Sequence, residues 1–125
     1  MTMKTLLSSI AAIAMLGLAP AAAQADEMSK NTVLINTFTV PADKLEETIV
    51  YWEQARDFLK EQPGYVSTKL HQSLSPDAKY LLVNVAEWTS PEAFKAANAQ
   101  MQEKASLPKI EGVIPGPGLY RVIRN

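Results

Sequence analysis

The sequence predicts one α+β domain in which two helices cover one face of a four-stranded antiparallel sheet. Its strand-like and helix-like segments follow the order β-α-β-β-α-β, which is the split βαβ arrangement. A short turn joins the two middle strands, so these strands pair in antiparallel fashion. The chain has 125 residues, and the roughly 100 that follow an N-terminal leader fit a single domain.

Residues 1–25 are expected to be a cleaved signal peptide. Lys4 supplies a positive start, and "LLSSIAAIAMLGLA" is an apolar run too short to span a bilayer as a stable helix. Cleavage is expected after Ala23 or Ala25, and the alternative is an uncleaved membrane anchor. The mature protein is therefore expected to be periplasmic or secreted, without stable membrane insertion. It consists of a short polar segment, residues 26–31, and a folded domain, residues 32–125.

The composition excludes several classes of function. The chain has no cysteine, which excludes disulfides, cysteine-ligated zinc, iron–sulfur clusters and thiol catalysis. Its one histidine cannot build a multi-histidine metal site within a single chain. Lysine and arginine number 12 against 13 aspartate and glutamate residues, with no basic cluster, so neither nucleic acid nor an anionic membrane is an expected partner.

The first strand is expected over residues 32–40, "TVLINTFTV", which are rich in β-branched and apolar side chains. Side chains alternate between the two faces of a strand, so Asn36 shares one face with Leu34 and Phe38. An amide between two apolar side chains has no evident local partner. Asn36 is therefore the strongest candidate for a site residue.

The first helix is expected within "PADKLEETIVYWEQARDFLKEQPG", which has apolar residues at helical spacing over about five turns. Asp43 and Glu46 have the spacing of a capping box at its start, and a Pro-Gly pair ends it. Trp52 continues the apolar stripe of this helix. It is either a core residue or part of a wall that contacts a ligand.

A β-hairpin is expected from residues 65–74 and 79–88. The segment that joins them, "SPDA", suits a type I turn with Ser75 and Ala78 at its ends. A turn of this kind fixes the register, and the register decides which side chains share a face.

In this register Lys69 lies opposite Asn84 and His71 lies opposite Leu82. Lys69 is then the expected partner of the Asn84 amide, with a ligand as the alternative. The face that carries His71, Asn84 and Trp88 is polar and aromatic, and one chain is expected to leave it uncovered, although the pattern alone does not fix this. The other face, expected to be core, carries Val66, Thr68, Leu70 and Gln72 beside Leu81, Val83, Val85 and Glu87.

A second helix is expected within "TSPEAFKAANAQMQEK", with Ser90 as its N-cap and Pro91 as its first helical residue. The Pro/Gly-rich "LPKIEGVIPGPG" is expected to be a loop, and "LYRVIRN" the last strand. Two helices cover only one face of the sheet, and both faces carry apolar side chains. A face-to-face homodimer is therefore expected.

Three segments, "VLINTFTVPAD", "QPGYVSTKLHQSLSPDAKYLLVNVAEWTSPEAF" and "GLYRVI", resemble the antibiotic biosynthesis monooxygenase (ABM) family over residues 32–123. The resemblance implies a ferredoxin-like protomer that pairs into a dimeric α/β barrel, with a pocket between sheet and helices. Members of this family oxygenate phenolic compounds without metal or flavin, degrade haem, or oxidise quinols.

The haem-degrading branch of the family uses an asparagine on the first strand with a tryptophan and a histidine on the second helix. Asn36 matches the first of these, whereas the other two positions fall near Ala97 and Leu107. The resemblance therefore disfavours haem degradation by that mechanism.

Together these observations predict an exported, cofactor-independent monooxygenase that oxidises a small phenolic or quinol-type compound with O2. Such chemistry needs a base, donors for a developing oxyanion and a dry aromatic cavity. Asn36 and His71 are the candidate catalytic residues, His71 because imidazole titrates near neutral pH, with a structural role as its alternative. No cofactor or metal is expected. The candidate substrate-binding residues are Phe38, Trp52, Tyr65, Asn84 and Trp88.

Two other classes of function fit the same sequence. One is a module that binds a small hydrophobic molecule without chemistry, and the other is a structural dimer whose barrel is filled by side chains. An open cavity bounded by Asn36, Trp52 and Trp88 would count against the structural class. Oxygen consumption would separate an enzyme from a binding protein.

Overall fold

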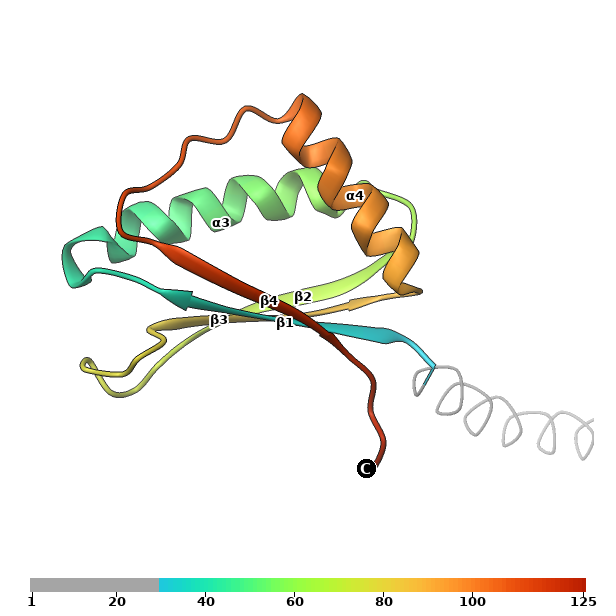
Figure 1. Ribbon diagram of the computed structural model, residues 1–125, viewed down its shortest axis with the longest axis horizontal. Coiled ribbons are helices and arrows are strands. Elements are labelled where there is room, and N and C mark those ends of the chain that lie inside the picture. The colour runs from blue at the N-terminus through green and yellow to red at the C-terminus, as the bar shows by residue number, and fades with distance from the viewer. Residues whose placement is uncertain (1–29) are drawn as a thin grey trace, which may run out of the picture. The chain divides into compact units, whose positions relative to one another are not determined.

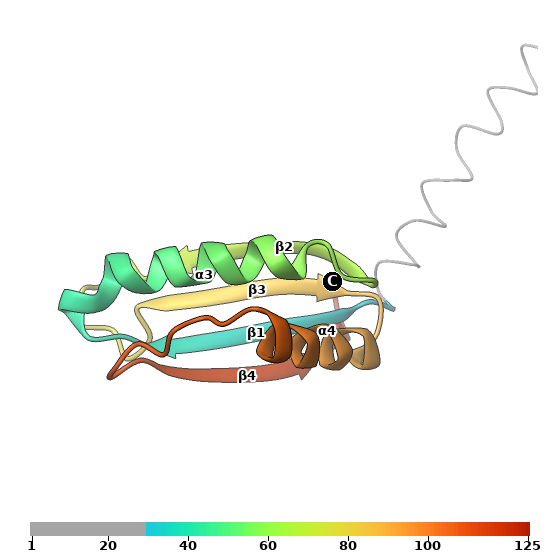
Figure 2. The ribbon, with the colours of Figure 1, turned by 90° about the horizontal axis from the view of Figure 1, so that it is seen from above.

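The computed structural model describes residues 30–125, so the expected signal peptide lies outside the described residues. These residues form one antiparallel sheet in the order β2-β3-β1-β4, with both helices on the same face (Figures 1 and 2). The predicted α+β class and element order are confirmed. Within the described part of the chain, no helix is long and apolar enough to cross a bilayer. The elements are β1 (Thr32–Thr39), a 3-10 turn (Ala42–Lys44), α3 (Leu45–Leu59), β2 (Tyr65–Gln72), β3 (Leu82–Trp88), α4 (Pro91–Lys104) and β4 (Ile114–Tyr120).

The two helices begin differently. At α4 the predicted N-cap, Ser90, is confirmed, because its hydroxyl accepts a hydrogen bond of 3.1 Å from a backbone N–H in the first turn. At α3 the predicted capping box is wrong, because Asp43 lies inside a 3-10 turn and the helix starts at Leu45 without a side-chain cap. The hydroxyl of Thr48 instead donates to the backbone carbonyl of Lys44 at 2.7 Å.

The hairpin between β2 and β3 contains the predicted turn. The backbone N–H of Ala78 donates to the carbonyl of Ser75 at 3.2 Å and closes it. The next hydrogen bond joins the N–H of Ser73 to the carbonyl of Leu81 at 2.8 Å. The chain therefore has one more residue on the β3 side of the turn than on the β2 side, and this asymmetry shifts the register.

The register observed between β2 and β3 differs from the predicted one by a single position over most of its length. His71 lies opposite Val83, and Asn84 lies opposite Leu70. A β-bulge near the start of β2 shifts the register back, so that Tyr65 pairs with Trp88 as predicted. The predicted pairs that prove wrong are Lys69 with Asn84 and His71 with Leu82.

The helices cover the sheet face that was expected to be open, so the predicted assignment of the two faces is wrong. Leu82 and Trp88 are each only 1% exposed beneath the helices, and Asn84 between them is 8% exposed. Both faces carry apolar side chains, so alternation along the strand does not distinguish them. The face without helices carries Val33, Ile35, Thr37 and Thr39 of β1, Ser67, Lys69 and His71 of β2, Val83, Val85 and Glu87 of β3, and Ile114 and Tyr120 of β4.

The buried core beneath the helices is divided into two clusters. Leu34, Ala86 and Trp88 pack with Ala97 of α4 toward one end of the sheet. Toward the other end, the cluster consists of Phe38, Val40 and Leu82. On β1 and β3 the position between the two clusters is occupied in each case by an asparagine, at 36 and 84.

The last strand begins at Ile114 and not at Leu119 as predicted, and residues 121–125 have no regular structure. The Pro/Gly-rich segment forms a strand because β4 lies at the edge of the sheet, where the outer side of a strand needs no hydrogen-bond donor. At Gly116 an added Cβ would lie 2.7 Å from the hydroxyl oxygen of Thr37, so a larger residue would require the Thr37 side chain to shift.

Candidate active-site cavity

A cavity of about 440 Å³ lies between the helix-covered face of the sheet and the two helices. Its walls come from all four strands, both helices and the loop that leads to β4. This volume falls in the range of small-molecule sites, roughly 300–1,000 Å³. The predicted site residues that line it are Asn36, Phe38, Trp52, Tyr65, Asn84 and Trp88.

The floor of the cavity carries two amides side by side. Asn36 on β1 and Asn84 on β3 are direct cross-strand partners, and both line the cavity. They occupy the gap between the two apolar clusters of the core. Paired residues of an antiparallel ladder point to the same face, with Cβ atoms about 4.5–5.5 Å apart. One small ligand can therefore contact both amides.

The orientation of the Asn36 amide is fixed by a neighbour on β4. The backbone N–H of Gly116 lies 3.1 Å from Oδ1 of Asn36. A backbone N–H only donates, so the atom that it contacts must be the carbonyl oxygen. The amide nitrogen is then the part of Asn36 left for a ligand, and within residues 30–125 no protein acceptor pairs with it.

Asn84 is held from the neighbouring strand β2. The hydroxyl of Thr68 donates to Oδ1 of Asn84 at 2.6 Å, so the expected partner, Lys69, is replaced by a hydroxyl from the adjacent residue. Thr68 also lines the cavity. The one-residue change of register explains this result, because it turns Thr68 toward the cavity and Lys69 to the open face.

Aromatic rings form one end of the cavity. The ring of Trp88 meets Tyr65 edge-on, with centroids 5.6 Å apart, and meets Phe94 of α4 in similar fashion at 5.7 Å. These edge-to-face contacts fix the position of Trp88 in the core. Phe38 and Trp52 add further aromatic surface, so the cavity offers flat apolar walls to a ring-shaped ligand.

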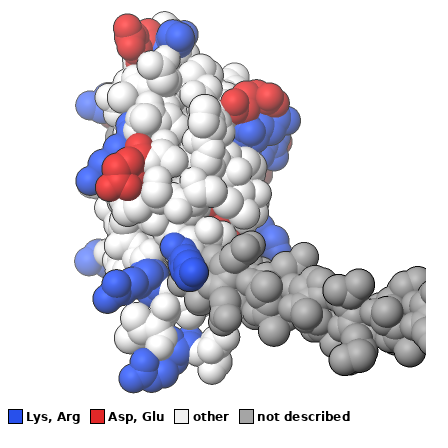
Figure 3. Space-filling view, turned by 90° about the vertical axis from the view of Figure 1, so that its right-hand side faces the viewer, with Lys and Arg blue, Asp and Glu red and all other residues white. Residues whose placement is uncertain are grey.

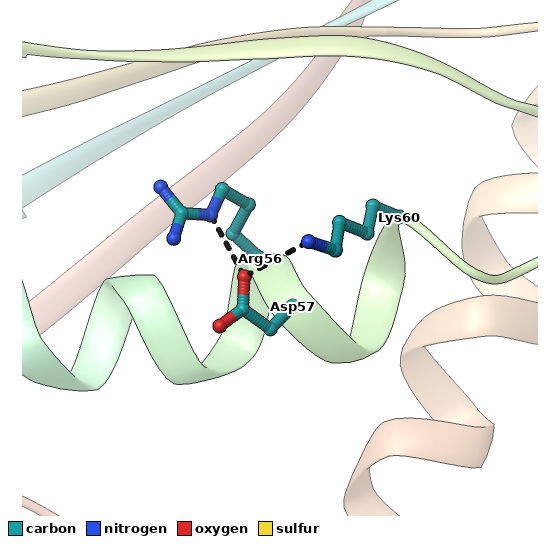
Figure 4. Close-up of polar contacts among 3 residues, drawn as sticks. All are labelled: Arg56, Asp57 and Lys60. Atoms are coloured by element: carbon teal, nitrogen blue, oxygen red, sulfur yellow. Dashed lines mark hydrogen bonds and ion pairs between the residues drawn. The ribbon is translucent and has the colours of Figure 1, made fainter.

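Among the described residues that line the cavity, the charged ones are both cations, Arg56 and Lys109. None of the described residues that line the cavity is an aspartate, glutamate or histidine. Arg56 lies over the ring of Trp52, 5.2 Å from its centroid, and its Nε donates to Oδ1 of Asp57 at 3.1 Å. This hydrogen bond from Arg56 holds the pKa of Asp57 below its ordinary value. Lys60 approaches the same oxygen at 3.4 Å (Figure 4).

His71 does not line the cavity. It is exposed on the face of the sheet without helices, where its Nδ1 lies 3.3 Å from the carbonyl of Val83. The expectation that it shares a face with Asn84 and Trp88 is therefore wrong. Charges of both signs also lie on the outer surface. On the side shown in Figure 3 they form several small groups among uncharged atoms, with acidic and basic side chains next to each other in places and no continuous basic stripe.

Sequence reasoning missed several polar groups of the cavity. The predicted register placed Thr68 on the face opposite to that of Asn84, which was expected to be core, and Lys109 lies in a loop that carries no motif. Arg56 did carry a signal, because it lies four residues after Trp52 in the apolar stripe of α3. A charged residue in such a stripe indicates a polar contact inside the protein. Asn98 and Gln102 of α4 line the cavity as well.

The positions that the haem-degrading branch uses on its second helix carry no haem ligand here. Ala97 is 2% exposed and packs in the core, and Leu107 lies in the loop after α4. In the part of the chain that the structure describes, no group of three or more histidine, cysteine, aspartate or glutamate side chains is placed to hold a metal ion.

Comparisons with known proteins identify the family and the fold. Residues 32–105 match the antibiotic biosynthesis monooxygenase family. A candidate monooxygenase from Shewanella loihica is 50% identical, with a TM-score of 0.70 over 76% of this chain and 96% of its own. SnoaB, a cofactor-independent oxygenase from Streptomyces nogalater, is 25% identical, with a TM-score of 0.59 over 77% of this chain and 96% of its own. No match is found among curated proteins.

The fold is also shared with a haem-degrading protein. MhuD from Mycobacterium tuberculosis is 22% identical, with a TM-score of 0.57 over 75% of this chain and 97% of its own. At this level of identity the likeness shows a common fold alone. The residues of the cavity, and not the fold, must therefore distinguish cofactor-independent oxygenation from haem degradation.

Proposed function

The chain belongs to the antibiotic biosynthesis monooxygenase family, and we propose that it is an exported, cofactor-independent monooxygenase that oxidises a small phenolic or quinol-type compound with O2. The observation that carries this proposal is the cavity, whose walls are aromatic and whose floor presents two asparagine amides. The similarity to a cofactor-independent oxygenase supports the same chemistry.

In the proposed reaction the substrate itself supplies the electrons that reduce O2. Loss of a proton from a phenolic hydroxyl gives an electron-rich anion that transfers an electron to O2, and the resulting radical pair combines at a ring carbon. One oxygen atom stays on the ring as a quinone carbonyl, and the other leaves as water. The protein contributes by positioning the ring, excluding water and stabilising the oxyanion.

Asn36 and Asn84 are proposed to hold the substrate oxygen. The amide nitrogen of Asn36 is the available end of its side chain, because Gly116 occupies the oxygen. The Thr68 hydroxyl donates to the side-chain oxygen of Asn84 at 2.6 Å, which leaves the amide nitrogen of Asn84 available as well. Both amides thus present N–H donors to an oxyanion. Donors fixed in advance stabilise developing charge without reorganising during the reaction.

The charge of the cavity wall favours an anionic substrate. Arg56 and Lys109 are cations, and no carboxylate among the described lining residues opposes a phenolate. His71 lies on the other face of the sheet, so substrate deprotonation in this proposal does not run through it. The substrate is therefore expected to be an acidic phenol or hydroquinone that binds readily as its anion.

A second candidate function is a binding protein that performs no chemistry. The absence of an imidazole or carboxylate base from the described cavity wall favours it. The open cavity counts against the third class, a structural dimer filled by side chains. The two remaining candidates make different predictions for turnover.

The deciding experiment is oxygen uptake by the purified protein with a panel of naphthols and hydroquinones, after dialysis against a chelator. A monooxygenase consumes isotopically labelled O2 and places one labelled atom in a quinone product, which mass spectrometry detects. Recovery of bound but unchanged compound, without oxygen uptake, would select the binding protein. Uptake that leaves no label in the product would contradict monooxygenation.

A homodimer is part of the proposal because the open face of the sheet carries several apolar side chains that no helix covers. Ile35, Val83 and Val85 are half-buried there in the single chain, and Ile114 and Tyr120 are 63% and 57% exposed. Native mass spectrometry should show a dimer for the unmodified protein and a monomer for Ile35→Lys.

The matched control for the dimer is Val50→Lys, which places the same charge on an exposed position of α3 and should remain dimeric. A monomer for the unmodified protein at micromolar concentration would refute the homodimer.

Export is tested separately. The protein recovered from the periplasm of a bacterial host should have a mass that corresponds to cleavage after Ala23 or Ala25. A full-length chain in the membrane fraction would contradict export with cleavage.

A further inference from the structure

Arg56 is held on two sides before any ligand arrives. Its guanidinium lies over the Trp52 ring, 5.2 Å from the centroid, and its Nε is bound to Asp57 at 3.1 Å. Its side chain is 35% exposed and lines the cavity. An arginine fixed in this way loses little conformational freedom when it binds a further group.

The terminal nitrogens of Arg56 remain available. Among residues 30–125 the one hydrogen bond that the guanidinium makes is through Nε, and Figure 4 shows both terminal nitrogens on the side away from the Asp57 carboxylate. A planar pair of N–H donors matches the two oxygens of a carboxylate. The free edge of the guanidinium is therefore suited to a planar anion.

The local charge remains positive despite the neighbouring carboxylate. One oxygen of Asp57 contacts both Arg56 and Lys60, so a single negative charge is shared between two cations. Lys109 adds a further positive charge to the cavity wall. An anion that reaches Arg56 consequently meets a site with a net positive charge.

We propose that Arg56 is a specificity-determining residue, which selects ring compounds that carry a carboxylate in addition to the phenolic hydroxyl. This inference rests on the proposed function, since it takes the aromatic cavity to be the substrate site. The hydroxyl lies at the two asparagines, and the carboxylate lies at the guanidinium on the α3 wall. Trp52, which packs against the guanidinium and also lines the cavity, contacts the apolar body of the substrate.

The competing explanation is that Arg56 only packs against Trp52 and stabilises α3. The two explanations differ in what they predict for ligands. A packing role changes stability and affects all ligands alike, whereas a selecting role changes affinity only for ligands that carry the anionic group. A pair of probes that differ in one carboxylate separates them.

The test uses isothermal titration calorimetry without oxygen, so that binding is measured in the absence of turnover. The probes are a hydroxynaphthoate and the naphthol that lacks only its carboxylate. Arg56→Gln removes the charge at similar side-chain length. Lys95→Gln makes the same change of net charge at an exposed position of α4 outside the cavity and is the control.

We expect the unmodified protein to bind the hydroxynaphthoate about tenfold more tightly than the naphthol, a difference of about 1.4 kcal/mol. Arg56→Gln should abolish this preference and leave naphthol affinity within about twofold, while Lys95→Gln keeps the preference. If Arg56→Gln weakened the affinity for both probes by the same factor, the inference would be overturned and a packing role would be supported. Equal binding of both probes by the unmodified protein would also overturn it, and would leave the proposed function standing. Binding of neither probe would overturn the inference and the proposed function together.

Discussion

The substitution Asn36→Asp separates two roles of this side chain, its hydrogen bond to Gly116 and its proposed donation to the substrate. Aspartate has nearly the same shape and keeps an oxygen where Gly116 donates its N–H at 3.1 Å, so the contact with β4 is retained. The amide nitrogen, the part that is proposed to donate to the substrate, is replaced by an oxygen that accepts. The variant therefore removes the proposed catalytic function and preserves the structural one.

The magnitude follows from the loss of one preorganised donor to a developing oxyanion, which costs about 10²–10³ in kcat, or roughly 2.7–4 kcal/mol. An ionised aspartate also repels a phenolate, and this acts in the same direction. Stability should change little, since the hydrogen bond to Gly116 survives. We therefore expect Asn36→Asp to fold normally and to lose at least about a hundredfold in the rate of oxygen uptake.

The companion variant Asn36→Ala removes both the donor and the acceptor. Gly116 is exposed, so water can replace the lost acceptor, and the expected loss of stability is only about 0.5–1.5 kcal/mol. Initial rates of oxygen uptake and thermal unfolding are measured for both variants with the same phenolic substrate. A folded Asn36→Asp protein that turns over at the unmodified rate would refute the donor role of this residue.

Three further outcomes are expected. Thr68→Val removes the hydroxyl bound to Asn84 at 2.6 Å, and it should lower both stability, by about 1 kcal/mol, and activity; an unchanged melting curve would count against this contact. Gly64→Ala should lower stability by about 1–3 kcal/mol in denaturant unfolding, because the residue has a φ of 89° and an added Cβ would overlap α4. The hydrogen bond from Arg56 lowers the pKa of Asp57, so the ionised carboxylate favours the folded state above its ordinary pKa, and this contribution is lost as pH falls through the lowered value. Arg56→Gln should therefore raise the pKa of Asp57 in an NMR titration, and an unmoved titration would contradict the pairing.

The sequence allowed the fold and most of the cavity to be predicted because these depend on local patterns. Helical spacing located α3, and the serine-proline pair located the start of α4. Strand alternation identified Asn36 as an amide among apolar side chains. The structure places three of the candidate site residues, Asn36, Trp52 and Trp88, in the wall of one cavity.

The features that the sequence did not predict depend on single residues or on long-range contacts. One additional residue after the hairpin turn shifts the register, so that Thr68 and not Lys69 contacts the side chain of Asn84. Alternation did not decide which sheet face the helices cover, because both faces carry apolar side chains, and His71 was therefore assigned to the wrong face. The polar groups from loops, such as Lys109, reach the cavity only through the tertiary fold.

The two prolines of β4 make the edges of the sheet unequal. Pro115 and Pro117 lack the backbone N–H groups that an added strand would need, and β4 is one of the two outermost strands. The other outermost strand, β2, contains no proline between Tyr65 and Gln72. Any extension of the sheet by a peptide or by a second chain is thus favoured at β2, and the β4 side is protected against uncontrolled strand-by-strand growth.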